Sequence, residues 1–244
     1  MIDWTQVQRV LVIRLRSIGD TVLSTPSLLS LRRFLPDAQI DVLLEDWVAP
    51  VLQGSDLVDK VIRVGTGSLA RLGTAVRLRE AKYDVVFNLH GGTTSTFFTR
   101  FTGARHRVGY KNYQYSSFYT DLLTSSSDFW GEEKTHSAEQ QLALLGFAGV
   151  PVTDRPRSSL DVDAEASVQI NGLLQSRGIG TDKFALIHSS SAFSTKQWAP
   201  ENYARLAEYL AACGIRRVAV ANKAESQVLN RVVDASRVPV VTFD

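Results

Sequence analysis

The feature that most constrains the fold is a regular alternation of short apolar runs with longer segments of helical pattern. The apolar, β-rich runs lie at residues 9–14, 39–44, 59–64 and 84–89, with a shorter one at 107–110. Segments with helical character lie at residues 20–34, 68–81 and 136–145. Strands separated by helix-length segments form right-handed βαβ crossovers and a parallel sheet. Residues 1–150 are therefore predicted to form an α/β domain with a parallel sheet, within which the aromatic, serine-rich segment 112–131 is ambiguous.

A break in composition separates this region from a second α/β run. Residues 151–163 carry two prolines and no periodicity, which is typical of an interdomain linker. Helices are then predicted at 164–177, 201–212 and 224–234, and strands at 183–188, 216–221 and 239–242. A doubly wound domain normally has five or six strands. Residues 164–244 are thus expected to be part of a larger domain of a longer protein, the alternative being an unusually small second domain.

Composition excludes several classes of protein. The hydrophobic fraction of 44% and the charged fraction of 21% are ordinary for a globular chain. The single cysteine, Cys213, excludes an intramolecular disulfide and a thiolate-rich metal site, and the four histidines lack ligand spacing for zinc. No apolar run is long enough to span a bilayer, and the N-terminus lacks a signal-peptide pattern. We expect a cytoplasmic protein without a metal or a cofactor.

The distribution of charge is more informative than the net charge of +2. Between residues 60 and 111, ten basic residues stand against only two acidic ones, Glu80 and Asp84. The basic residues are Lys60, Arg63, Arg71, Arg77, Arg79, Lys82, Arg100, Arg105, Arg107 and Lys111. They form either solvated helix faces or a cleft that attracts a phosphorylated or carboxylated ligand. Nucleic acid fits less well, because no motif of interleaved aromatic and basic residues accompanies them.

The loop after the first predicted strand carries a candidate base. Ligands of open α/β sheets bind beyond the carboxyl ends of the strands, where residues 15–20 (LRSIGD) lie. In this loop Gly19, close to Ser17, permits a tight turn and a close backbone approach to a ligand. Asp20 lies in the first turn of the following helix, where it is either a cap or a general base. A helix N-terminus would keep its carboxylate ionised.

A second loop at the end of a strand, residues 188–198 (HSSSAFSTKQW), has the composition of a diphosphate site. Ser189, Ser190, Ser191 and Lys196 offer hydroxyls and a point positive charge just before a helix N-terminus. The loop lacks the Walker A spacing, and a flexible polar loop is the alternative. Glu225 follows the next strand, where it either accepts hydrogen bonds from a ribose or is an ordinary acid at a helix start.

Two segments resemble the ADP-heptose:lipopolysaccharide heptosyltransferases, glycosyltransferase family 9. They are residues 10–43 (VLVIRLRSIGDTVLSTPSLLSLRRFLPDAQIDVL) and 188–210 (HSSSAFSTKQWAPENYARLAEYL). The resemblance implies an α/β fold of GT-B type, in which two Rossmann-like domains face each other across a cleft. It also implies an inverting, metal-independent transfer of heptose from ADP-heptose to an inner-core sugar of lipopolysaccharide.

The resemblance also implies roles for individual residues. Asp20 matches the catalytic base, Lys196 matches a lysine at the donor diphosphate, and Glu225 matches an acid at the adenosine ribose. Ser189, Ser190 and Ser191 fall in the polar loop near that diphosphate. The first domain of such an enzyme binds the acceptor, for which the weaker candidates are His90, Arg105, Arg107 and Lys111. Because that acceptor is anionic and linked to lipid, peripheral contact with the inner membrane is expected.

The sequence departs from the family pattern at two points. Residues 198–200 read W-A-P where the plain version is W-P. The family's second domain continues with a D-x-G-x-x-H-like donor loop, which we expect in a longer form of this protein. Two alternatives remain open: a non-catalytic module that binds a nucleotide or polyanion, and a GT-B transferase or epimerase with a different nucleotide-sugar donor.

Overall fold

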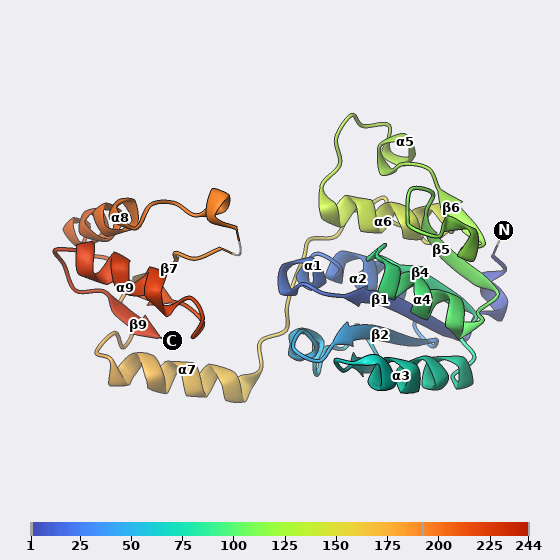
Figure 1. Cartoon of the computed structure of the whole chain (residues 1–244), viewed down its shortest axis with the longest axis horizontal. Coiled ribbons are helices and arrows are strands. Elements are labelled where there is room, and N and C mark those ends of the chain that lie inside the picture. The colour runs from blue at the N-terminus through green and yellow to red at the C-terminus, as the bar shows by residue number, and fades with distance from the viewer. Residues whose placement is uncertain (1, 192, 244) are drawn as a thin grey trace. The chain divides into compact units, whose positions relative to one another are not determined.

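A computed structural model describes residues 2–191 and 193–243 (Figure 1). The chain divides into two compact units, Met1–Asp161 and Val162–Asp244. The division lies within the segment 151–163. The beginning of that segment packs on the first unit, where Val152 is buried and Arg155 pairs with Glu132 and Glu139.

The first unit is built on a six-stranded, entirely parallel sheet with the order β3-β2-β1-β4-β5-β6. The strands are β1 (Arg9–Leu15), β2 (Gln39–Glu45), β3 (Lys60–Val64), β4 (Val85–Asn88), β5 (His106–Tyr110) and β6 (Asp121–Leu123). The chain runs outward from β1 in one direction and from β4 in the other, so the strand order reverses between β1 and β4. This is the Rossmann order, and ligands of such sheets bind where the order reverses.

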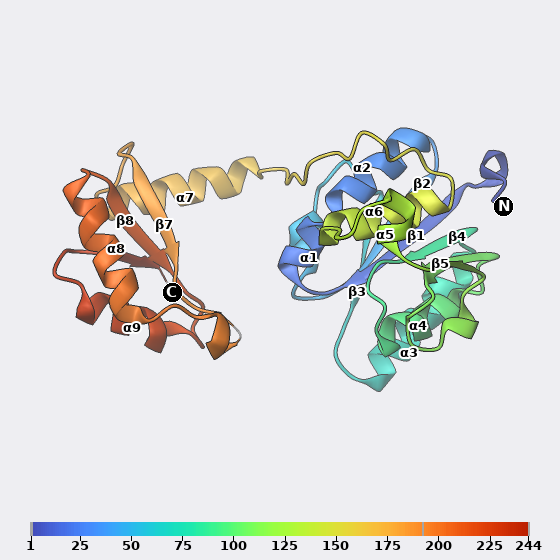
Figure 2. The same cartoon turned by 90° about the horizontal axis from the view of Figure 1, so that it is seen from above.

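Helices cover both faces of this sheet. They are α1 (Ile18–Val22), α2 (Thr25–Phe34), α3 (Ser68–Glu80), α4 (Thr93–Thr102), α5 (Ser126–Trp130) and α6 (Ser137–Phe147). Three 3₁₀ turns accompany them: η1 (Trp4–Gln6), η2 (Ala49–Leu52) and η3 (Ser116–Phe118). Helices α2 and α6 lie on one face, and α3 and α4 lie side by side on the other (Figure 2).

The side chains of alternate strand residues pack in two separate hydrophobic cores, one on each face of the sheet. Val10 and Val12 of β1 pack in the core under α2 and α6, whereas Leu11 and Ile13 pack in the core under α3 and α4. Strands that are buried on both faces read as continuous apolar runs, because neither set of side chains faces water. This explains why the central strands were predictable from the sequence.

Three elements of the first unit differ from the predictions. The predicted helix 20–34 is two helices, because Ser24 begins α2 and Pro26 occupies its first turn, where a missing N–H costs little. Helix α4 was not predicted, since its sequence TTSTFFTRFT consists mostly of β-branched and aromatic residues, which are weak helix formers. Burial of Phe98 holds it in place. The ambiguous segment 112–131 contains η3, β6 and α5.

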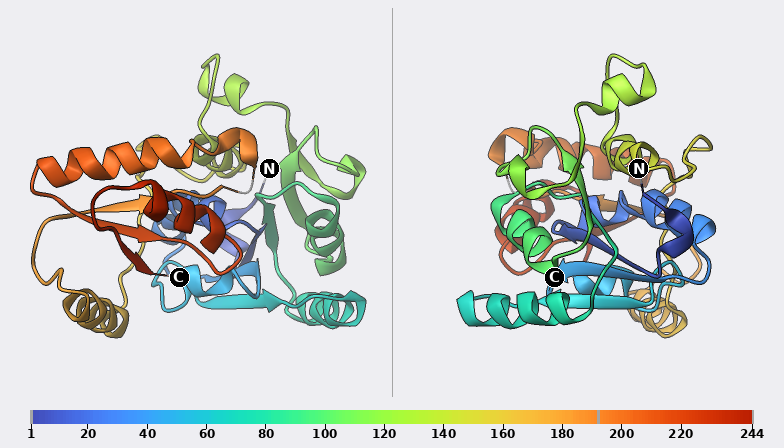
Figure 3. Two further views of the ribbon diagram at one scale, coloured as in Figure 1. Left: turned by 60° about the vertical axis from the view of Figure 1, so that its left-hand side comes forward. Right: turned by 90° about the vertical axis from the view of Figure 1, so that its right-hand side faces the viewer.

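The second unit has a three-stranded parallel sheet with the order β7-β8-β9. Its elements are α7 (Ala164–Ser176), β7 (Phe184–His188), η4 (Ser194–Lys196), α8 (Pro200–Ala212), β8 (Arg216–Val220), α9 (Ser226–Ala235) and β9 (Val241–Phe243). Helices α8 and α9 lie side by side (Figure 3) and share a small core with the sheet, at Ile187, Ala219 and Leu229. In neither unit does a described helix have the length and apolar character needed to cross a bilayer.

Candidate functional site

A polar cavity of about 510 Å³ lies at the carboxyl ends of β1 and β4, where the strand order reverses. Its centre is formed by Arg14 near the end of β1, Asp20 in α1, and Leu89 and His90 directly after β4. Its other lining residues are Tyr110, Asn112, Tyr113, Thr124, Ser125, Ser126, Ser137, Gln140, Gln141 and Leu144. This cavity is where a Rossmann-like domain places its ligand.

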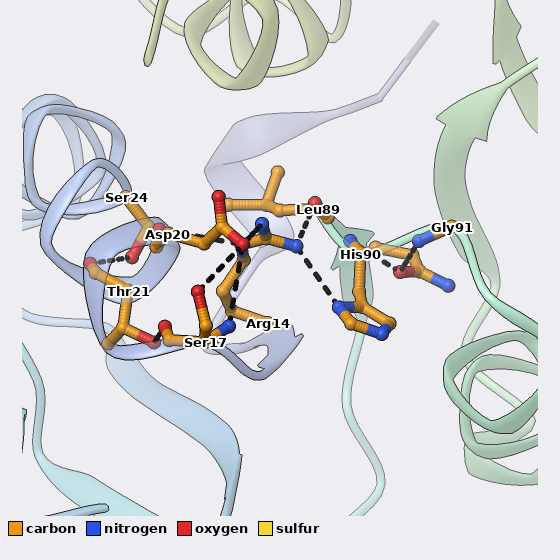
Figure 4. A network of polar contacts seen from close by, with 9 residues as sticks. Arg14, Ser17, Asp20, Thr21, Ser24, Leu89, His90 and Gly91 are labelled. Carbon is orange, nitrogen blue, oxygen red and sulfur yellow. Dashed lines mark hydrogen bonds and ion pairs between the residues drawn. The ribbon is translucent and has the colours of Figure 1, made fainter. Parts of the chain in front are cut away.

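Arg14 organises the cavity, although its position in the sequence predicts only the end of a strand. Its side chain is almost completely buried, and a buried arginine requires partners. Nη1 donates to the Leu89 carbonyl at 3.0 Å and to His90 Nδ1 at 3.1 Å, and Nη2 pairs with Asp20 Oδ2 at 2.9 Å (Figure 4). The guanidinium therefore joins the loop after β1 to the loop after β4. The sequence signal for this role is an arginine at the end of an apolar run that is expected to be buried.

The two oxygens of Asp20 have different surroundings. Oδ2 accepts hydrogen bonds from Ser17 Oγ at 3.1 Å and from Ser17 N at 3.4 Å, in addition to the ion pair with Arg14. The bond from Ser17 N is one half of the capping box at the start of α1, in which the Ser17 side chain also accepts from the Asp20 backbone N–H. Oδ1 accepts no hydrogen bond from any residue that the structure describes, and the Asp20 side chain is 41% exposed. Oδ1 is thus available to a ligand, while Oδ2 fixes the carboxylate.

The charges around the cavity set two protonation states. Burial raises the pKa of Asp20, but Arg14 and the hydrogen bonds from Ser17 outweigh it, so the pKa is lowered and the carboxylate is ionised at neutral pH. Burial and the neighbouring Arg14 and Arg16 lower the pKa of His90, which is therefore neutral. Because a guanidinium can only donate, His90 Nδ1 is the acceptor and its proton is on Nε2. The cavity thus presents an anion beside a neutral donor.

The turn after β1 differs in detail from the prediction. Gly19 lies in the first turn of α1 rather than at a tight turn, and open space surrounds the position that a Cβ would occupy there. The left-handed residue is Leu15, with φ 42°. A leucine rarely adopts this conformation, and strained backbone of this kind is concentrated at functional sites. Ser17 precedes α1 as its N-cap residue.

The candidate acceptor residues do not all reach the cavity. His90 lines it, and Lys111 is exposed directly after β5, at the carboxyl end. Arg105 and Arg107 lie at the amino end of β5, and a five-residue strand separates the two ends by roughly 13 Å. Arg107 donates instead to the carbonyls of Ala104 and Phe118. The structure therefore does not place Arg105 and Arg107 in the cavity.

The ten basic residues between 60 and 111 do not gather in a single cleft. Lys60, Arg63 and Arg77 line one surface depression, together with residues of β2. Arg79 and Arg100 line a different one, beside α3 and α4. The β3 strand and the faces of α3 direct their basic side chains to separate surfaces, so the charge excess along the sequence does not become one patch.

In the second unit, the predicted donor residues follow two neighbouring strands. Ser189 and Ser190, directly after β7, are buried, and neither hydroxyl has a hydrogen-bond partner among residues 2–191 and 193–243. Lys196 is exposed in η4, with Nζ 5.4 Å from the centre of the Phe193 ring. Glu225, after β8, is the N-cap residue of α9. Because β7 and β8 are parallel neighbours, these loops lie at one edge of the sheet.

The chemistry of this edge suits an anion. Buried hydroxyls without partners are unusual in native proteins, and an anion would accept hydrogen bonds from those of Ser189 and Ser190. The Ser191 carbonyl accepts a hydrogen bond from Gln197 Nε2 at 2.7 Å, and the Ser189 and Ser190 hydroxyls make no hydrogen bond to a described residue. No cluster of His, Cys, Asp or Glu suited to a metal ion occurs in the described part of the chain. The donors of this edge are hydroxyls and the Lys196 ammonium.

Comparison with known proteins identifies the family. A match to glycosyltransferase family 9 (heptosyltransferase) covers residues 71–242 and so includes parts of both units. The chain belongs to glycosyltransferase family 9. This family 9 chain is 26% identical over 217 residues to lipooligosaccharide heptosyltransferase 2 of Haemophilus ducreyi, with 83% of the chain and 60% of that protein covered. It is 26% identical over 239 residues to lipopolysaccharide heptosyltransferase 2 of Salmonella typhimurium, covering 93% of the chain and 67% of that protein.

Solved structures show the same fold. A glycosyl transferase family 9 protein from Veillonella parvula superposes with a TM-score of 0.83 at 23% identity, covering 96% of the family 9 chain and 68% of the other. The E. coli ADP-heptose lps heptosyltransferase II gives a TM-score of 0.75 at 22% identity, covering 93% and 68%. The predicted α/β fold of GT-B type with Rossmann-like domains is confirmed. The chain spans about 60% of the length of the Haemophilus ducreyi relative.

Proposed function

We propose that this family 9 chain acts in the inverting transfer of heptose from ADP-heptose to the inner core of lipopolysaccharide, on the cytoplasmic side of the inner membrane. Its relatives from Haemophilus ducreyi and Salmonella typhimurium are named as heptosyltransferases. The observation that carries the proposal is the state of Asp20: an ionised carboxylate at the point where the strand order reverses, with one oxygen held and the other open.

Asp20 is the proposed general base. A hydroxyl oxygen of the acceptor attacks the anomeric carbon of the heptose from the face opposite the diphosphate, and a new C–O bond forms. The bond from that carbon to the diphosphate oxygen breaks, and its electron pair leaves with ADP. The hydroxyl proton passes to Asp20 Oδ1. A lowered pKa makes Asp20 a weak base, which suits a reaction whose nucleophile becomes acidic only as the leaving group departs.

Residues of the second unit are proposed to bind the donor. The Lys196 ammonium and the hydroxyls of Ser189, Ser190 and Ser191 stabilise the charge that develops on the departing diphosphate. Glu225 accepts hydrogen bonds from the ribose. These groups supply the positive charge and donors that a diphosphate requires, so the proposed reaction needs no metal ion. Within the first unit, His90 lines the cavity, and we assign it to the binding of the acceptor sugar.

The test is transfer by Asp20 variants. The chain is mixed with ADP-heptose and core oligosaccharide, and the product is measured by mass. Asp20→Asn should lower the rate by about 10²–10⁴-fold while ADP affinity is unchanged. The matched control is Asp163→Asn, which removes a helix-start acid that caps α7 outside the cavity and should leave the rate within about twofold of the unsubstituted chain.

Three outcomes contradict all or part of the proposal. An Asp20→Asn chain that transfers heptose at the normal rate excludes the base assignment. An unsubstituted chain that binds ADP but yields no product supports the alternative of a non-catalytic nucleotide-binding module. Turnover with another nucleotide sugar in preference to ADP-heptose would retain the base and replace the donor.

A further inference from the structure

An apolar groove of about 950 Å³ runs along the outer surface of α3 and α4, apart from the polar cavity. Its apolar lining comes from Val76 of α3, Phe97 and Phe101 of α4, and Tyr115 and Phe118 of the segment that contains η3. We call it the α3–α4 groove. The rings of Phe97 and Phe101 pack at a tilt with 4.3 Å between their centres, and those of Tyr115 and Phe118 stack at 5.9 Å.

The apolar surface extends beyond the groove along α3. Leu69, Leu72 and Val76 follow one another at helical spacing, and all three are exposed, Leu69 by 86%. Soluble monomers rarely expose a continuous apolar surface of this kind, and those that do use it for binding. The buried face of the same helix, at Thr74, Ala75 and Leu78, already packs on the sheet. The exposed stripe is therefore a second apolar face with no role in this core.

Two arginines line the groove, and a third contacts the backbone of a lining residue. Arg79 and Arg100 line it, and Arg107 donates through Nε to the carbonyl of Phe118, which also lines it. Burial and then the positive charge of Arg100 lower the pKa of Arg107. The nearby acids are fewer: Glu80 lines the groove, and Asp121, beside Arg107, pairs with His106 at 3.2 Å.

One segment links the groove to the cavity that holds Asp20. Asn112 and Tyr113 line the cavity, whereas Tyr115 and Phe118, a few residues later, line the groove. The loop between β4 and α4 makes the same connection, because His90 lines the cavity and Thr93, at the start of α4, lines the groove. The Thr93 hydroxyl donates to the side-chain carbonyl of Gln114 and ties the two segments together.

We propose that the α3–α4 groove seats the first unit on an anionic lipid surface, with its aromatic side chains in the lipid and its arginines on the headgroup phosphates. An apolar face with aromatic residues and adjacent arginines is the composition of a peripheral membrane site. The excess of guanidinium groups over acids selects a negatively charged surface over a neutral one. Lipid binding requires only this surface, whereas its use in presenting a lipid-linked acceptor to Asp20 rests on the proposed function.

The test measures binding of the 244-residue chain to vesicles by co-sedimentation. Vesicles of phosphatidylglycerol and phosphatidylcholine should retain the chain, vesicles of phosphatidylcholine alone should retain at least about fivefold less, and raised salt should weaken the binding. Equal binding to both kinds of vesicle, or binding to neither, would overturn the proposal.

Paired variants locate the surface. The double variant Phe97→Ser and Phe101→Ser should lower binding at least tenfold, and Arg100→Glu at least about fivefold. Phe147→Ser is the control for the aromatic change, because Phe147 is 43% exposed at the end of α6 and Phe101 is 42% exposed. Arg231→Glu, on the exposed side of α9, is the control for the charge change. Thermal unfolding of each variant shows whether it is folded.

Sedimentation velocity tests the competing occupant, a second copy of the chain. A dimer that the Phe97 and Phe101 changes dissociate, together with unchanged lipid binding, would assign the groove to self-association and overturn the proposal. Transfer to a lipid-linked and to a delipidated acceptor separates the two proposals. Vesicle binding without transfer leaves the lipid site standing and contradicts the proposed function. Normal transfer to the delipidated acceptor without vesicle binding supports the proposed function and contradicts the lipid site.

Discussion

Replacing Arg14 with methionine removes the group that connects the two halves of the cavity in the first unit. Methionine fills much of the same volume but donates nothing, so the Leu89 carbonyl and His90 Nδ1 both lose their donor. A buried polar atom without a partner costs about 1–3 kcal/mol. The lost ion pair with Asp20 adds little to the cost of the substitution, because the Asp20 side chain is 41% exposed and water can solvate it. We expect the free energy of unfolding to fall by about 3 kcal/mol, and Tm by roughly 6–12 °C.

The loss should depend on pH in a defined direction. Asp20 has a folded pKa below its unfolded value, so its pairing stabilises the fold above about pH 4 and stops doing so as pH falls through the folded pKa. The lowered pKa of His90 acts in the same direction, because the unfolded chain takes up that proton first below about pH 6.5. Arg14 contributes to both shifts. The stability difference between the chain and its Arg14→Met variant should therefore shrink as pH falls from 7 to 4.

Urea unfolding followed by tryptophan fluorescence, at pH 7 and at pH 4, measures both effects. The control is Arg33→Met, which removes an exposed pair with Asp154 and should cost less than about 1 kcal/mol. Arg14→Lys should recover only part of the loss, because a single ammonium cannot reach three acceptors as the guanidinium does. If Arg14→Met is no less stable than Arg33→Met, or if its deficit grows towards pH 4, the role assigned to the buried arginine is wrong.

Three further changes probe other parts of the chain. Gly109→Ala would place a Cβ 2.5 Å from the ring of Tyr119 and should destabilise the first unit by about 1–3 kcal/mol, which an unchanged urea midpoint would contradict. Phe98→Ala removes the fully buried ring that holds α4 and should cost about 3–5 kcal/mol in the same experiment, and a loss below 1 kcal/mol would show that α4 does not depend on it. Lys196→Ala should weaken ADP binding about 10- to 100-fold by calorimetry, whereas Lys183→Ala, before β7, should not, and equal effects would remove Lys196 from the donor site.

The strands of the central sheet were predictable because each one carries its own apolar pattern within a few consecutive residues. A strand buried on both faces is apolar at most positions, and β1, β2 and β4 follow this pattern at their buried positions except at Arg14, Asp41 and Asn88. Helix α4 shows the opposite case, because its threonines and phenylalanines have poor helix propensity and only packing on the sheet makes them helical. The spacing of residues within 93–102 does not predict that packing.

Only the part of the candidate site that lies within a single loop could be predicted from the sequence. Ser17, Gly19 and Asp20 lie together in sequence, so the end of β1 could be singled out from the chain alone. The contact between Arg14 and His90 joins residues 76 positions apart, and it depends on β1 and β4 being neighbours in the sheet. The excess of basic residues between 60 and 111 did not predict one cleft, because residues close in sequence can face different surfaces. Arg77 and Arg79, both in α3, line different depressions.

Asp20 also shows that a cap and a base are compatible roles for one carboxylate. Oδ2 closes the capping box with Ser17 and pairs with Arg14, and this fixes the direction in which Oδ1 is presented. Asp20→Asn keeps an oxygen for the cap but loses the negative charge, whereas Asp20→Ala loses both. If Asp20 is only a cap, stability and transfer should fall together, and Asn should rescue both. If Asp20 is the base, Asn should preserve most of the stability measured by urea unfolding and still abolish transfer.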